Sequence, residues 1–333
     1  MQFGRLKRRE FIALIGGAAA WPVPAGAQQH ANIRRIGMYM SVSADDAELV
    51  LLAFRQELER LGWSDGRNVR IDYRFAPAGV QATPFAKELL ALQPDVILAV
   101  STPITAALQR ETRAVPIVFV GITADPISSG FVASLPRPGG NLTGVVLFEV
   151  TVIGKWLAML KEIAPRLAHA ALVFNPKTAP YYDYYLRAGE AAASSLAVEF
   201  APLTIENSAA DIERAIRAFA RVPNGGLVVL PDSTNDVHRD LLIGLAAKHR
   251  LPAVYSSRFY VAVGGLMCYS TDRVAQFRQV ASYIDRILRG AKPADLPVQV
   301  PTKYETVINM RTVKALGLTV PPGLLVAADE VIE

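Results

Sequence analysis

The chain has 333 residues, of which 51% are hydrophobic, enough to bury the cores of about two domains. Its net charge of +5 comes mostly from residues 1–27, and the remainder is close to neutral, without the basic stripe typical of nucleic-acid-binding proteins. The single cysteine, Cys268, forms no internal disulfide, and the four histidines lack the spacing of a zinc site. We therefore expect no metal and no cofactor.

Residues 1–27 have the order of an export signal: basic residues, an apolar stretch from Phe11 to Trp21, and small residues up to Ala27. The apolar stretch is shorter than the about 20 residues that span a bilayer. The segment Arg8 to Ile12 (RREFI) resembles a twin-arginine translocation signal. A general secretory signal and a retained membrane anchor are the alternatives. No cysteine follows the stretch, so we predict a soluble periplasmic product and not a lipoprotein.

Short apolar runs then alternate with amphipathic segments, the pattern of βαβ units on a parallel sheet. The strands predicted in the first half are residues 35–40, 69–75, 95–100, 116–120 and 142–148. The helices predicted between them are residues 46–61, 82–92 and 103–112.

The second half repeats this order. Its predicted strands are residues 170–174, 198–203, 227–230, 253–255 and 266–270. Its predicted helices are residues 155–163, 183–195, 208–220, 236–249 and 273–288, before a Pro-rich return through 292–301.

The repeated order predicts an α/β fold of two doubly wound, Rossmann-like lobes. Lobe one comprises residues 32–148 and about 257–298. Lobe two comprises residues 149–256 and about 299–325. Several segments cross between the lobes, which makes the connection a hinge.

In open parallel sheets, ligands bind outside the carboxyl ends of the strands. Two such edges that face each other across a hinge would enclose a small molecule. The loops at these edges supply the candidate ligand-binding residues, which are Ser41, Ser43, Ser101, Thr102, Thr123, Asp125, Asn175, Tyr181, Asp232, Ser233, Thr234 and, at a strand end, Tyr255.

Some of these residues suggest specific chemistry. Ser101 and Thr102 precede Pro103, so one of them is expected to cap a helix whose free N–H groups attract a carboxylate. Asp125 and Asp232 would accept a hydrogen bond from a ligand ammonium. Capping without a ligand, and an ordinary Asp-Pro turn, are the alternatives.

The tyrosines after the strand at 170–174 suggest an aromatic contact. Tyr181 would stack on a planar ligand, while Tyr185 is expected to pack in the core. Tyr255 and Arg258 are weaker candidates at the end of the strand at 253–255.

The chain from about residue 33 to its end resembles the ABC transporter substrate-binding proteins of the tryptophan/tyrosine type. The resemblance implies the periplasmic-binding-protein type 1 fold, an ABC permease and ATPase at the inner membrane as partners, and ligand contacts at Ser101, Thr102, Asp125 and Asp232. Many relatives have Gly-Thr where this chain has Ser101-Thr102. The segments that carry the resemblance are FRQELERLGWSDGR (54–67), NVRIDY (68–73), PDVILAVS (94–101), PIVFVGITADP (116–126), GFVASLPRPGGNLTG (130–144), residues 292–300 and VINMRTVKALGL (307–318).

The sequence therefore predicts a periplasmic solute-binding protein, expected to be monomeric, that captures an amino acid or a related small organic anion. A ligand-sensing subunit for a membrane signalling protein is the first alternative, because its binding lobes would look the same. An enzyme is a weaker alternative: Cys268 lies in an apolar strand, the setting of an inert thiol, and no GxSxG motif is present.

Overall fold

The computed structural model describes residues 33–41, 43–76 and 81–333, and residues 34–333 form one compact unit. The predicted export signal at residues 1–27 lies outside the described residues. Among the helices that the structure describes, none combines the length and the apolar character needed to cross a membrane.

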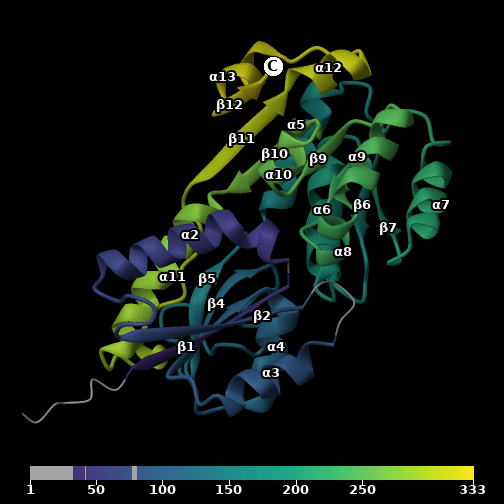
Figure 1. Ribbon diagram of the computed structural model, residues 1–333. Coiled ribbons are helices and arrows are strands. Elements are labelled where there is room, and N and C mark those ends of the chain that lie inside the picture. Colours follow the sequence, from purple (N-terminus) through teal and green to yellow (C-terminus); the bar gives the residue numbers. More distant parts are fainter. Residues whose placement is uncertain (1–32, 42, 77–80) are drawn as a thin grey trace, which may run out of the picture. The chain divides into compact units, whose positions relative to one another are not determined.

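The first sheet is built from the first half of the chain, and all its strands are parallel (Figure 1). Its order is β2-β1-β3-β4-β5. Ile36 of β1 aligns with Ile71 of β2 on one side and with Val96 of β3 on the other. The strands are β1 (Arg34–Met40), β2 (Val69–Phe75), β3 (Val96–Val100), β4 (Ile117–Ile122) and β5 (Leu142–Val146).

The second sheet has the order β12-β11-β10-β9-β8-β6-β7, so its five strands β7-β6-β8-β9-β10 repeat the order of the first sheet. The strands are β6 (His169–Phe174), β7 (Glu199–Thr204), β8 (Gly225–Val229), β9 (Ala253–Tyr255), β10 (Met267–Thr271), β11 (Tyr304–Asn309) and β12 (Glu330–Ile332). The repeated order confirms the predicted pair of doubly wound lobes.

Two features of the second sheet differ from the prediction. The segment from residue 257 to 271 was expected in lobe one, yet β10 pairs with β9 and, antiparallel, with β11 in the second sheet. Strands β11 and β12 were not predicted. Because β10 presents a free edge, the chain returning after the Pro-rich segment adds to it, and Met267 aligns with Ile308.

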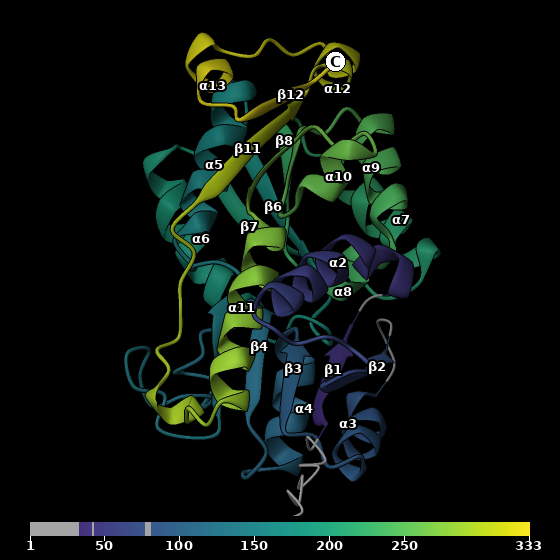
Figure 2. The same ribbon diagram turned by 60° about the vertical axis from the view of Figure 1, so that its left-hand side comes forward.

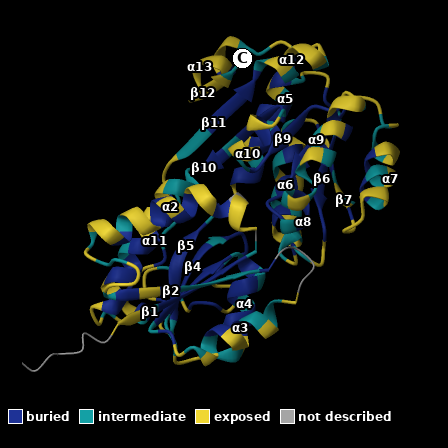
Figure 3. Cartoon of the chain, in the orientation of Figure 1, coloured by how far each residue is buried: buried dark blue, intermediate teal, exposed yellow. Residues whose placement is uncertain are grey.

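Helices cover both faces of each sheet, and the strands between them are largely buried (Figure 3). In the first lobe, α2 (Ala44–Arg60) and α11 (Arg273–Leu288) cover one face, and α3 (Ala82–Ala91) and α4 (Thr102–Glu111) cover the other. In the second lobe, the helices are α5 (Val152–Ile163), α6 (Tyr182–Ser195), α7 (Ala209–Phe219), α8 (Ser233–Val237), α9 (Arg239–Lys248), α10 (Arg258–Ala262), α12 (Met310–Leu316) and α13 (Pro322–Val326).

The described chain passes between the two sheets three times: after β5, between β10 and α11, and before β11 (Figure 2). The third passage leaves the first sheet at Gln299, which forms a parallel bridge with Val145. Thus α11, which covers the first sheet, directly follows β10 of the second sheet. We call the first sheet with α2, α3, α4 and α11 the first lobe, and the second sheet with its helices the second lobe.

Candidate functional site

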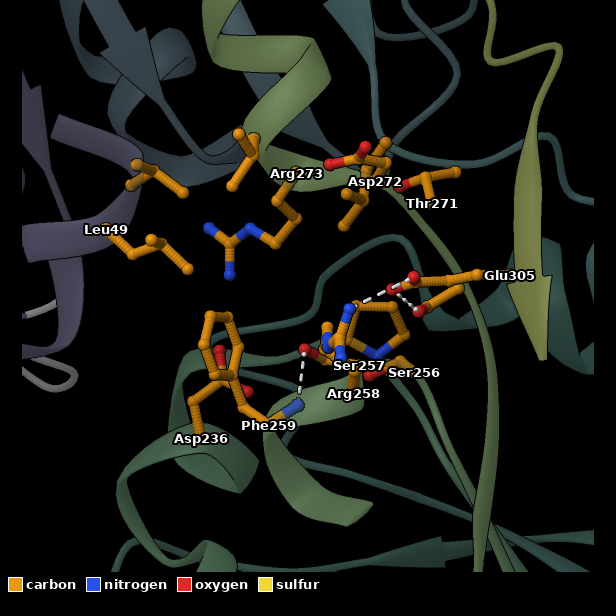
Figure 4. A pocket seen from close by; sticks show the side chains of 15 residues that line it. Leu49, Asp236, Ser256, Ser257, Arg258, Phe259, Thr271, Asp272, Arg273 and Glu305 are labelled. Carbon is orange, nitrogen blue, oxygen red and sulfur yellow. Dashed lines mark hydrogen bonds and ion pairs between the residues drawn. The ribbon is translucent and has the colours of Figure 1, made fainter. Parts of the chain in front are cut away.

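A cavity of about 330 Å³ is lined by side chains of both lobes (Figure 4). The first lobe contributes Leu49 of α2 and Arg273 of α11, and the second lobe contributes Asp236 and Phe259. Ser256, Ser257 and Arg258 also line it, and Arg258 was a weaker candidate from the sequence. An adjoining cavity of about 420 Å³ shares several of these residues and is also lined by the predicted residues Ser41, Ser43 and Ser233.

Arg273 is a desolvated cation that lines this cavity. It is the first residue of α11, and its guanidinium extends toward the side where Leu49 and Phe259 lie (Figure 4). By exposed area the residue is only half-buried, but the surrounding protein desolvates the guanidinium, which lowers the pKa of Arg273; the nearby charge of Asp236 opposes this effect. Among the described residues, no carboxylate forms an ion pair with it.

The second arginine of the cavity, Arg258, has partners. It forms ion pairs with Glu305, at 3.3 Å, and with Glu330. Burial raises the pKa of Glu305, and Ser270 donates a hydrogen bond to it at 3.4 Å. The two arginines therefore differ in chemistry: Arg258 is part of a charge network, whereas Arg273 is available to an anion.

Four predicted residues hold the loops of the second lobe together. The backbone N–H of Asn175 donates to Asp232 Oδ2 at 2.7 Å, and that of Thr234 donates to Asp232 Oδ1 at 3.0 Å. Thr178 also donates to Asp232, and Tyr181 donates from its hydroxyl to the carbonyl of Pro231 at 2.7 Å. Burial raises the pKa of Asp232 to about 6.

These bonds occupy the polar atoms that we expected to face a ligand. Asp232 is 3% exposed and accepts three hydrogen bonds within its own lobe. The arrangement favours a role in positioning the loops, and direct ligand contact by Asp232 stays a prediction. Tyr255 is 2% exposed and stacks on Tyr260 with ring centroids 4.9 Å apart, so it belongs to the core.

The expectation that Ser101 or Thr102 caps α4 is wrong. Ser101 stands at the cap position but makes no side-chain bond to the helix. Thr102 instead accepts hydrogen bonds from the backbone N–H groups of Thr123 and Ala124, at 3.0 and 3.2 Å, because its hydroxyl turns toward the neighbouring strand end. These bonds fix the loop after β4.

Ser101 is also strained. Its φ of 101° is a conformation that only glycine adopts readily, and its Oγ is buried without a partner among the described residues. The serine therefore stores backbone strain next to the carboxyl end of β3.

Thr123 and Asp125 line a separate cavity of about 250 Å³, together with Tyr184. Asp125 accepts a hydrogen bond from the backbone N–H of Ser128 at 2.6 Å, which is an ordinary turn contact. The carbonyl of Thr123 accepts a hydrogen bond across the lobes from the hydroxyl of Tyr185, at 3.1 Å. Thr123 therefore lines the smaller cavity and also takes part in a hydrogen bond between the lobes.

Sequence reasoning missed the principal charged residues of the larger cavities. Arg273 was placed only as the start of a helix, although it follows the carboxyl end of a strand, the same signal that nominated the other loops. Asp236 was counted within a long helix that the structure divides at His238 into α8 and α9. Leu49 and Phe259 are apolar, so a search for polar side chains at strand ends could not find them.

Comparison with known proteins places the chain among binding proteins. A family model described as ABC transporter substrate binding protein matches residues 35–332. A tyrosine-binding protein of Clostridioides difficile (strain R20291) is 25% identical over 296 residues, which cover 86% of this chain and 81% of the relative.

Two solved structures have a similar fold. The ABC domain of Streptococcus pneumoniae in complex with L-Trp matches with a TM-score of 0.82 at 24% identity, covering 90% of this chain and 99% of that one. A conserved domain protein of Vibrio cholerae O1 biovar eltor matches with a TM-score of 0.82 at 26% identity and the same coverage. These matches confirm the predicted two-lobed α/β fold.

Proposed function

This chain belongs to the family of ABC transporter substrate-binding proteins, and we propose from that premise that it captures an amino acid or a related small organic anion for an ABC permease and its ATPase. The observation that carries the proposal is the cavity of about 330 Å³ that both lobes line, with charged groups of both signs and apolar walls. This volume is at the lower end of small-molecule sites, as expected for a single amino acid. The tyrosine-binding relative and the L-Trp complex support this ligand class.

Binding without catalysis is part of the proposal. Cys268 is fully buried, and burial raises the pKa of its thiol to about 12, so it is a poor nucleophile at neutral pH. The relatives of this chain are named for binding a substrate. The twin-arginine-like leader at residues 1–27 supports a place in the periplasm after export.

In the mechanism we propose, ligand contacts on both lobes favour a closed arrangement about the three crossing segments. Ser41, Ser43 and Ser233 line the adjoining cavity and supply polar contacts from there. Asp232, Asn175 and Thr234 act indirectly, because their bonds fix the loops that carry these contacts. Thr123 and Asp125 stay secondary candidates at the smaller cavity.

Mass spectrometry of small molecules that co-purify with the mature protein tests this function. A thermal-shift panel of aromatic and branched amino acids and their deaminated acids would follow. We expect at least one member to raise the Tm in a concentration-dependent way. A protein that carries no small molecule and responds to no member of the panel would contradict the proposed function.

A further inference from the structure

We propose that Arg273 anchors a carboxylate group of the ligand while Leu49 and Phe259 hold its apolar part, so that the ligand class is a carboxylate with an apolar side chain. This inference rests on the proposed function and adds the orientation of the ligand. Among the described residues, none forms a hydrogen bond or an ion pair with the Arg273 guanidinium.

The first step is the cost of an unpaired guanidinium. Taking an ion out of water without a counter-ion is strongly unfavourable, and buried charges in proteins are normally paired. Arg258 in the same cavity follows this rule with two carboxylates. Arg273 has no such partner among the described residues, and a carboxylate from a ligand would satisfy it with two parallel N–H···O bonds.

The second step is that the nearby acidic residues are engaged elsewhere. Asp236 accepts a hydrogen bond from the hydroxyl of Tyr260 at 2.9 Å and acts on Arg273 only through its field. Asp272 caps α11 by accepting from the backbone N–H of Ala275 at 3.0 Å. Neither carboxylate forms an ion pair with Arg273.

The third step is the apolar wall. Leu49 is 54% exposed and Phe259 is 36% exposed, and they stand on different lobes beside the Arg273 guanidinium (Figure 4). A ligand carboxylate on Arg273 would therefore place the adjoining part of the ligand between two apolar side chains. Such walls favour an aromatic or branched group over a polar one.

The fourth step is the position of Arg273 at a crossing between the lobes. It follows β10 of the second lobe and begins α11 of the first. One turn later, Gln276 donates to the carbonyl of Val146 at the end of β5, at 3.1 Å. A carboxylate bound at Arg273 thus contacts the hinge itself and would couple binding to the arrangement of the lobes.

Isothermal titration calorimetry with four related probes tests the inference. The probes are L-tyrosine, 3-(4-hydroxyphenyl)propionate, which lacks the ammonium, and L-tyrosinamide and tyramine, which lack the carboxylate; L-tryptophan and L-leucine with their amides extend the set. We expect the carboxylates to bind and the amides and amines to bind about 100-fold more weakly, the size expected on removing one partner of a desolvated charge pair.

Variants of the full mature chain give the matched comparison. Arg273→Met should weaken the tightest carboxylate about 100-fold, and Arg273→Lys should recover part of the loss. Arg278→Met removes an exposed arginine from the same helix and should change affinity less than about twofold. Without ligand, the Tm of Arg273→Met should equal or exceed that of the wild type, because an unpaired buried charge has been removed.

Three results would overturn the inference. One is an Arg273→Met protein that binds the carboxylate as tightly as the wild type, and another is equal binding of L-tyrosine and L-tyrosinamide; the proposed function would survive both. The third is a wild-type protein that binds no carboxylate of the set although another solute co-purifies with it. Failure of the proposed function is a different result, in which nothing binds and nothing co-purifies.

Discussion

Asp232 and Arg273 are two desolvated charges at the carboxyl edges of the strands, and they differ in their partners. Asp232 accepts three hydrogen bonds from its own lobe, including two from backbone N–H groups. Arg273 has a positive charge that no ion pair of the described residues neutralises. Burial alone does not separate a structural charge from a ligand contact; the presence of partners does.

The substitution with the largest expected effect on folding removes Asp232, the charged residue that has hydrogen-bond partners. Asp232→Ala leaves the N–H groups of Asn175 and Thr234 without their acceptor, so the free energy of unfolding should fall by about 3 kcal/mol in urea denaturation. The affinity of the folded fraction should change less than about tenfold. A variant with wild-type stability and no ligand binding would make Asp232 a ligand contact instead.

The pH dependence of stability examines the same carboxyl group. Burial raises the pKa of Asp232 from 3.8 to about 6, so between these values the folded state binds a proton that the unfolded state has released. The free energy of unfolding should therefore decrease as pH rises from about 4 to about 6, by up to about 3 kcal/mol. This slope should disappear in Asp232→Asn, and parallel curves for the two proteins would refute the shift.

Ser101, like Arg273, has a polar side chain without a partner among the described residues. Ser101→Gly removes a strained φ of 101° and a buried hydroxyl without a partner, so the free energy of unfolding should rise by about 1–2 kcal/mol. Thermal unfolding measures the change, with Ser128→Gly in an exposed turn as control. A fall in stability would indicate that Ser101 has a stabilising contact in the folded protein.

The smallest effect concerns the apolar wall. Phe259→Ala should weaken the tightest carboxylate about tenfold, because a half-exposed ring loses its contact with the ligand. Its Tm without ligand should stay within a few degrees of the wild type. Val326→Ala, at an 87% exposed valine of α13, is the matched control, and equal affinities of the two variants would remove Phe259 from the site.

Most of the fold could be predicted because the parallel strands are short apolar runs whose order is set by βαβ connections. The segment 304–309 could not, since its pairing with β10 depends on an edge that only the folded second sheet presents. The same limit applies to the site. The loop rule nominated Ser41, Ser43 and Ser233, which line the adjoining cavity, but it also nominated the buried Tyr255, because a strand end does not reveal which face is buried.

Arg273 could not be identified as unpaired from sequence, because its state depends on where Asp236, Glu305 and Glu330 lie after folding. Its position after a strand was visible, and applying the strand-end rule to 266–270 would have nominated it. Which residue pairs with each charged side chain depends on the tertiary structure. The sequence therefore indicates which loops line the cavities better than it indicates which charged side chains there lack partners.

A crystal structure of the mature protein with its co-purified or tightest ligand tests the central claim most directly. The account predicts a ligand carboxylate within hydrogen-bonding distance of the Arg273 guanidinium, with Leu49 of one lobe and Phe259 of the other against its apolar group. A ligand in the smaller cavity beside Asp125 and Tyr184, with Arg273 still lacking an anion, would contradict it.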